Sequence, residues 1–175
     1  MLYNLSDAEL DELSRINIAC SALSFTGSSL ILITYLSYRQ LQKFSFRLVF
    51  WLSFSDVCLS VCYFLGRPEG KTVRCYIQAY LSQFFNLASF LWTSVIAFAL
   101  HRTVVQHRED TVNMHNRFHL FVWAVSLVFS LLPTIKDSYA AGFGPWCWIT
   151  GQTVFGRVLR FLVFYIPLWI CIFYN

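Results

Sequence analysis

The sequence predicts an all-α integral membrane protein with five membrane-spanning helices, and three observations support this prediction. Of the 175 residues, 57% are hydrophobic and only 13% are charged, whereas about a quarter of the residues are charged in an average soluble domain. The few charges leave long uncharged runs of the length that a bilayer-crossing helix needs, roughly 20 residues. Aromatic residues make up 19% of the chain, and such side chains favour the membrane interface.

The apolar runs define five spans. They cover approximately 16–38, 46–65, 75–105, 118–135 and 157–175. Ser6 and Glu9 form a capping box, which predicts a short amphipathic turn that leads into the first span. Pro133 is expected to end the fourth span, and residues 136–155 are expected to form a loop. Residues 16–175 thus form one transmembrane domain, and we expect it to be C-terminally truncated because no polar or basic flank follows the fifth span.

The orientation that we expect comes from the cysteines, because Lys and Arg divide almost evenly between the two sides of the membrane. Cys75 lies at the start of the third span, and Cys147 lies in the loop after the fourth, at the same membrane face. In an oxidising compartment these two thiols would form a disulfide, with two free thiols as the alternative. The disulfide would place residues 1–15 outside the cell, where Asn4 begins a glycosylation sequon.

Polar residues recur at helical spacing in the spans, and such stripes mark packed faces because polar side chains avoid lipid. The longest stripe follows the third span and consists of Gln78, Ser82, Asn86, Ser89 and Thr93. Two interpretations remain open for it. One is a face that packs against other helices, and the other is a polar cavity lined mainly by the third helix. Both interpretations require a helical bundle.

Asp56 is an ionisable residue near the middle of the second span, where a charge is costly and points to a function. No Lys or Arg lies at the same depth in the five spans. We therefore expect Asp56 to be protonated, solvated by Asn or Ser in a cavity, bound to a cation, or paired with a helix outside this chain. A switching or ion-binding role and a buried structural role remain open.

No motif predicts an enzyme, a cofactor or a metal site. His101, His107, His115 and His119 have a spacing that fits no common metal site, and no Cys or acidic residue completes one. A glycine pattern for nucleotide binding is absent, and nothing predicts binding to nucleic acid. His101 and Arg102 lie at the inner end of the third span with Arg108 nearby, so they are candidates for contact with an intracellular partner. Solvated residues at the membrane edge are the alternative.

Several motifs resemble the cyclic-AMP-receptor-like family of G-protein-coupled receptors, which includes slime mold chemoattractant receptors and a plant relative. The plant-type member is the likeness that fits best. The motifs are Lys43-Phe44-Ser45-Phe46 with Ser55-Asp56, Ser89-Phe90-Leu91-Trp92-Thr93 with His101-Arg102-Thr103-Val104-Val105, Trp123, Gly144-Pro145-Trp146-Cys147-Trp148, and Tyr165-Ile166-Pro167-Leu168-Trp169. They follow the family's order over nearly the whole chain after about Ile16.

The resemblance implies a GPCR-type bundle in the plasma membrane, of which five of seven helices are present here. It also implies an outward-facing pocket for a small extracellular ligand, with a cyclic nucleotide as one candidate, and coupling to heterotrimeric G proteins inside. Gln78, Ser82, Trp148 and Arg160 form the candidate ligand face. Without helices six and seven, the chain as given is not expected to signal.

Two other functions remain as alternatives. A truncated receptor isoform or fragment can dimerise with a full-length receptor as a non-signalling partner and hold it in the endoplasmic reticulum. A transporter or channel would show broken helices or paired repeats, and neither is visible in the sequence.

Overall fold

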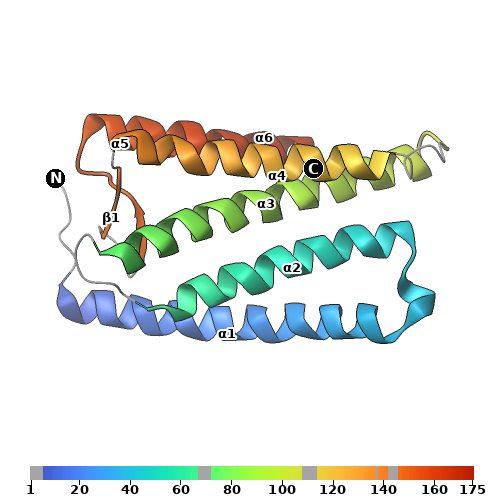
Figure 1. Ribbon diagram of the computed structural model, residues 1–175, viewed down its shortest axis with the longest axis horizontal. Coiled ribbons are helices and arrows are strands. Elements are labelled where there is room, and N and C mark those ends of the chain that lie inside the picture. Colours follow the sequence, from blue (N-terminus) through green and yellow to red (C-terminus); the bar gives the residue numbers. More distant parts are fainter. Residues whose placement is uncertain (1–5, 67–71, 108–113, 137, 142–145) are drawn as a thin grey trace.

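The computed structural model describes residues 6–66, 72–107, 114–136, 138–141 and 146–175. Its helices lie side by side along one long axis, and a two-stranded sheet covers one end (Figure 1). The elements are α1 (Asp7–Ser37), η1 (Arg39–Leu41), α2 (Phe44–Phe64), α3 (Val73–Val104), α4 (His115–Leu131), η3 (Leu132–Lys136), β1 (Tyr139–Ala141), β2 (Cys147–Ile149), α5 (Val154–Arg160), η4 (Phe161–Tyr165) and α6 (Ile166–Tyr174). Helices α5, η4 and α6 continue one another and make one crossing.

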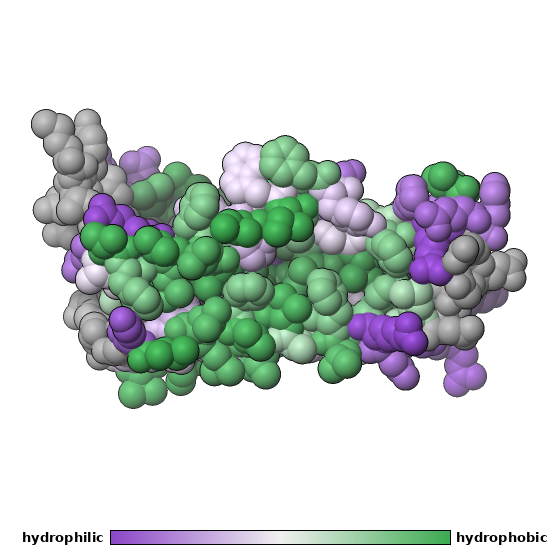
Figure 2. Space-filling model, turned by 90° about the horizontal axis from the view of Figure 1, so that it is seen from above, coloured by the Kyte–Doolittle hydropathy of each residue, from purple (hydrophilic) through white to green (hydrophobic). Residues whose placement is uncertain are grey.

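The surface of the bundle is suited to lipid. Figure 2 shows a wide hydrophobic band over the middle of the molecule and hydrophilic residues gathered toward its two ends. Large apolar side chains point outward from the band, with Leu120 72% and Phe173 81% exposed. Exposed apolar area on this scale marks a membrane-contacting surface. Five helical segments of the described chain are long and apolar enough to cross a membrane.

Helix α3 is the centre of the bundle, because it packs against α2, α4, α6 and both strands. Two apolar cores lie along it. One surrounds Trp92, which is fully buried, and includes Leu48 from α2 and Val122 from α4. The other lies beside the sheet and includes Tyr139 and Ile149. Helix α1 contributes little to either core and packs against α2 at the edge of the bundle.

The first helix is longer than the predicted span at 16–38. Ser6 and Glu9 form the capping box that the sequence predicts: the Ser6 hydroxyl accepts from the Glu9 N–H at 3.3 Å, and the Glu9 carboxylate accepts from the Ser6 N–H at 2.7 Å. The helix runs from this cap without a break to Ser37. The predicted amphipathic turn is therefore the first part of α1 itself, since nothing in the sequence after the cap interrupts it.

Residues 136–155 were expected to be a loop, and this expectation misses the hairpin of β1 and β2. The strands are antiparallel, with Tyr139 opposite Ile149 and Ala141 opposite Cys147. Strands of three residues are too short to show a periodic pattern in the sequence. Their position is set by contacts with α3, which is distant along the chain. Before the hairpin, α4 ends at Leu131 and Pro133 lies in η3.

The fifth crossing contains an irregular turn that the sequence analysis did not anticipate. Its middle segment, η4, is a π-helical turn that ends two residues before Pro167 of α6. Proline has no N–H to donate to the carbonyl four residues earlier, which is that of Val163, and its ring crowds this carbonyl. A π-helical turn is one of the ways in which a helix adapts to such a proline.

Gly156 is expected to be irreplaceable in the turn where α5 begins. A Cβ at this position would overlap the Thr150 carbonyl oxygen, which belongs to the backbone and has little room to move. Gly156→Ala should lower the free energy of unfolding by roughly 1–3 kcal/mol, the usual cost of overpacking, measured as a lower thermal midpoint of the purified protein. Gly27→Ala is the matched control, because a Cβ at Gly27 meets nothing within 4 Å. Equal midpoints for the two variants would contradict the expected clash.

Candidate functional site

A disulfide anchors the hairpin to the start of α3. Cys75 and Cys147 are bonded as the sequence predicts, with Cα atoms 5.3 Å apart, and both side chains are fully buried. Tyr139 fixes the other strand, because its hydroxyl donates to the Ser130 carbonyl at 2.8 Å. Burial and the neighbouring Tyr80 phenol raise the pKa of Tyr139 far above its ordinary value, so it remains a protonated donor. We call this end of the bundle the disulfide face.

Gln78 joins three elements beneath the disulfide. Its side chain is fully buried, and its Nε2 donates to the carbonyls of Cys62 at 3.1 Å and Gly66 at 2.9 Å, at the end of α2. Its Oε1 accepts from the Cys147 N–H at 3.0 Å. The sequence analysis placed Gln78 on the candidate ligand face. In the structure its amide bonds to backbone groups of α2 and β2, which have no water to bind in the bundle.

Gln83 is a second buried glutamine, and it was not among the residues predicted from the sequence. Its Nε2 donates to the Val163 carbonyl at 3.3 Å, and its Oε1 accepts from the Trp148 indole N–H at 2.7 Å. The Val163 carbonyl is the group that Pro167 deprives of its helical partner. Gln83 therefore links α3 to both the π-helical turn and β2. The signal that could have found it is the proline itself, since a proline inside a span leaves a carbonyl that needs another donor.

A cavity of about 230 Å³ lies next to Gln83, toward the disulfide face. Its lining comes from α2, α3, the segment around β2, and the fifth crossing: Tyr63, Ser82, Asn86, Trp146, Trp148, Phe164 and Tyr165. Two members of the predicted ligand face, Ser82 and Trp148, line it. Arg160 does not, because its Nε donates to the Ile149 carbonyl at 2.5 Å and its guanidinium lies 4.7 Å from the centre of the Trp148 ring. Arg160 thus contacts the Trp148 ring, which is part of the cavity wall, without lining the cavity itself.

A chain of polar groups descends from this cavity into the bundle. The Asn86 side-chain amide donates to the Tyr63 hydroxyl at 3.2 Å and to the Ser82 carbonyl at 2.9 Å. Further along α3, the Ser89 hydroxyl donates to Asp56 Oδ1 at 2.7 Å. Asp56 was expected to be protonated, solvated by Asn or Ser, bound to a cation, or paired with another helix. In the structure it accepts a hydrogen bond from a serine, Ser89. The stripe on α3 serves both proposed purposes, since Ser82 and Asn86 line the cavity and Ser89 joins two helices.

The opposite end of the bundle, which we call the Arg102 face, is basic. Arg102 is half-buried at the end of α3, where its Nη1 donates to Met114 Sδ at 3.4 Å, and His101 is exposed beside it. The described basic residues at this end are Arg39, Lys43, Arg47, Arg102 and Arg117, and no described carboxylate lies there. Arg108 and Asn4, which the sequence analysis also singled out, lie outside the described residues.

Two of the histidines have a packing role. His119 Nδ1 accepts from the Trp123 indole N–H at 3.1 Å, and its ring centroid lies 4.9 Å from those of Trp51 and Trp92. His115 packs against His119 with ring centroids 4.4 Å apart. Within the described part of the chain, no group of three His, Cys, Asp or Glu residues is placed to hold a metal ion.

Comparison with known proteins identifies the architecture. A family model described as "Slime mold cyclic AMP receptor" matches residues 6–175. The chain belongs to the slime mold cyclic AMP receptor family. The resemblance seen in the sequence motifs is therefore confirmed.

Two curated relatives of the chain are named as a receptor and as a receptor-like protein. The chain is 45% identical over 163 residues to "G-protein coupled receptor 1" of Arabidopsis thaliana, covering 93% of this chain and 49% of that protein. It is 25% identical over 173 residues to "Cyclic AMP receptor-like protein A" of Dictyostelium discoideum, covering 99% of this chain and 45% of that protein. The chain thus spans about half the length of the curated relatives that it matches.

The crystal structure of squid rhodopsin has the same fold. It matches with a TM-score of 0.75 at 17% sequence identity, covering 99% of this chain and 56% of that one. The prediction of a GPCR-type helical bundle with five of its helices present is confirmed. This chain therefore shares the rhodopsin arrangement of these helices, and it is a multi-pass membrane protein.

Gln83 should contribute to stability because it donates to the Val163 carbonyl, which receives no hydrogen bond from Pro167. Gln83→Leu leaves the Val163 carbonyl and the Trp148 N–H without partners, and each loss costs about 1–3 kcal/mol. We expect a lower thermal midpoint in detergent. In a Pro167→Ala background, residue 167 regains an N–H that can bond to Val163, so Gln83→Leu should cost clearly less. An equal cost in both backgrounds would show that the two residues are not coupled.

Proposed function

We propose that the chain is the ligand-binding part of a G-protein-coupled receptor that binds a small extracellular molecule and signals to heterotrimeric G proteins when complete. The observation that carries this proposal is the course of α3. One helix lines the aromatic cavity with Ser82 and Asn86, contacts Asp56 in the bundle, and ends in Arg102 at the basic face. A conformational change at the cavity can therefore be transmitted to the Arg102 face through α3, which is one continuous packed helix.

The ligand that suits the cavity is a flat aromatic molecule with polar edges. Five of the seven lining side chains are aromatic, and the hydroxyl and amide groups of Ser82 and Asn86 offer hydrogen bonds. Mostly apolar walls with a few oriented polar groups are typical of small-molecule sites. A cyclic nucleotide has this chemistry, and the name of the Dictyostelium relative supports it as the first ligand to try.

We place the disulfide face outside the cell and the Arg102 face inside, at the plasma membrane. The Cys75–Cys147 disulfide supports this orientation because structural disulfides form and persist in oxidising compartments.

Cyclic AMP binding tests the ligand assignment. In membranes that contain the complete chain, Asn86→Leu should weaken the binding of radiolabelled cyclic AMP by about tenfold, because one buried hydrogen bond contributes roughly 1–2 kcal/mol. Thr93→Val is the control on the same stripe, since the Thr93 hydroxyl donates only to the Ser89 carbonyl of its own helix, at 3.0 Å. Equal affinities for the two variants would remove the cavity as the cyclic AMP site.

G-protein coupling tests the other half of the proposal. With the complete chain and a purified heterotrimer, Arg102→Ala should reduce receptor-stimulated nucleotide exchange at least tenfold, because a charged contact at an interface typically contributes 2 kcal/mol or more. Arg39→Ala removes an exposed charge from the same face but from the connection between α1 and α2, and it should retain most of the exchange rate. A normal rate in Arg102→Ala would contradict a direct role for this residue.

A further inference from the structure

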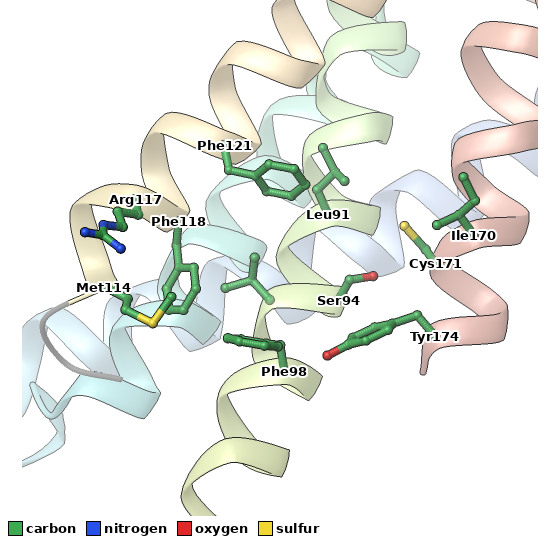
Figure 3. Close-up of a pocket in the computed structure, with 11 residues that line it drawn as sticks. Leu91, Ser94, Phe98, Met114, Arg117, Phe118, Phe121, Ile170, Cys171 and Tyr174 are labelled. Carbon is green, nitrogen blue, oxygen red and sulfur yellow. The ribbon is translucent and has the colours of Figure 1, made fainter. Parts of the chain in front are cut away.

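A second cavity, of about 460 Å³, opens on the outer surface of the bundle between α3, α4 and α6 (Figure 3). Its floor includes Leu91, Val95 and Phe118, which are 7%, 5% and 6% exposed. Its rim includes Phe121 from α4 and Ile170 from α6, which are 50% and 64% exposed. All three helices belong to membrane-crossing segments. The medium at the opening is therefore lipid rather than water, and we call this cavity the α3–α4–α6 groove.

The depth of this groove sets it apart from a second apolar hollow on the same protein. A hollow of about 310 Å³ lies between α1 and α2, and none of its lining residues is buried, with Leu30 59% and Phe46 46% exposed. A lipid chain there would contact the protein on one side only. A chain in the α3–α4–α6 groove would contact three helices, which increases the dispersion contacts that each methylene gains.

Polar groups lie at one end of the groove, toward the Arg102 face. Arg117 lines the groove, is exposed, and lies two residues after the start of α4, within about 3 Å of the helix end along its axis. Its guanidinium forms no hydrogen bond or ion pair with any residue that the structure describes. Tyr174 reaches across from α6, and its hydroxyl points toward Phe98 at the same end of the groove (Figure 3). This is the depth at which lipid headgroups meet the ends of helices.

The charge at this end favours an anionic headgroup. Arg117 is one of the basic residues of the Arg102 face. Phosphate oxygens are good partners for a guanidinium, and basic residues near a membrane surface each favour anionic lipid. The apolar groove and the basic mouth together match one kind of molecule, with a long hydrocarbon chain and a negatively charged head.

We propose that the α3–α4–α6 groove binds one anionic glycerophospholipid from the leaflet at the Arg102 face, with an acyl chain in the groove and its phosphate on Arg117. The site is separate from the aromatic cavity at the disulfide face, and its existence does not require any particular ligand in that cavity. A lipid held there contacts α4 and α6 at once, so it stabilises one position of α6 in the bundle.

Native mass spectrometry of the complete chain tests the headgroup assignment. The protein is released from nanodiscs of phosphatidylcholine and phosphatidylglycerol, and the retained lipids are counted. Arg117→Gln should lower the preference for phosphatidylglycerol about fivefold, the effect of losing the one basic group that contacts the headgroup of the bound lipid. Arg39→Gln removes an equally exposed charge from the same face, outside the groove, and should leave the preference unchanged. The proposal is overturned if both variants behave alike.

Photocrosslinking tests the position of the acyl chain independently of charge. Phosphatidylglycerol with a diazirine in one acyl chain should label the segments around Phe121 and Ile170 several-fold more than the hollow beside Leu30. Equal labelling would show boundary lipid only, and labelling absent from the groove would show that another part of the complete chain occupies it. Either result would overturn the proposal, even if Arg117→Gln changes the headgroup preference.

Discussion

The structure depends on one constraint, which is that polar groups inside a membrane bundle must find their partners within the protein. Water is absent from the hydrocarbon region, so an unpaired carbonyl or N–H there costs several kcal/mol. The two buried glutamines of α3 meet this requirement at the places where regular helix bonding stops. Gln78 binds the carbonyls at the end of α2, and Gln83 binds the carbonyl that Pro167 leaves free. Both side chains also hold the β2 segment, through Cys147 and Trp148.

This arrangement connects stability with the site. The wall of the aromatic cavity is held by Gln83 through Trp148 and by Arg160 from behind. A displacement of the fifth crossing relative to α3 alters the bond from Gln83 to Val163, and Gln83 links this displacement to Trp148. A ligand that contacts Trp148 therefore binds with different free energies to different positions of the fifth crossing, which is the condition for a ligand to shift a conformational equilibrium.

The sequence predicted the features that depend on local composition. The five crossings follow from hydropathy and length, and the Cys75–Cys147 pair follows from the depth of each cysteine at one membrane face. It did not predict the roles of Gln78 and Gln83, because each amide bonds to backbone groups more than ten residues away, up to Val163. Helical periodicity assigned Gln78 to a polar stripe but could not say whether this stripe faces a ligand or a neighbouring backbone. The hairpin of β1 and β2 was not predicted for the same reason, because contacts with the distant helix α3 set its position.

The aromatic cavity and the α3–α4–α6 groove contact the same crossing at different points. Phe164 and Tyr165 line the cavity, whereas Ile170 and Tyr174 line the groove. The π-helical turn ends at Tyr165, so the irregular segment of this crossing adjoins the cavity and the regular segment adjoins the groove. A lipid that fixes α6 then limits the positions available to the turn above it. Because thermodynamic coupling is reciprocal, a ligand that selects one position of the turn must change the affinity of the groove for lipid by the same factor.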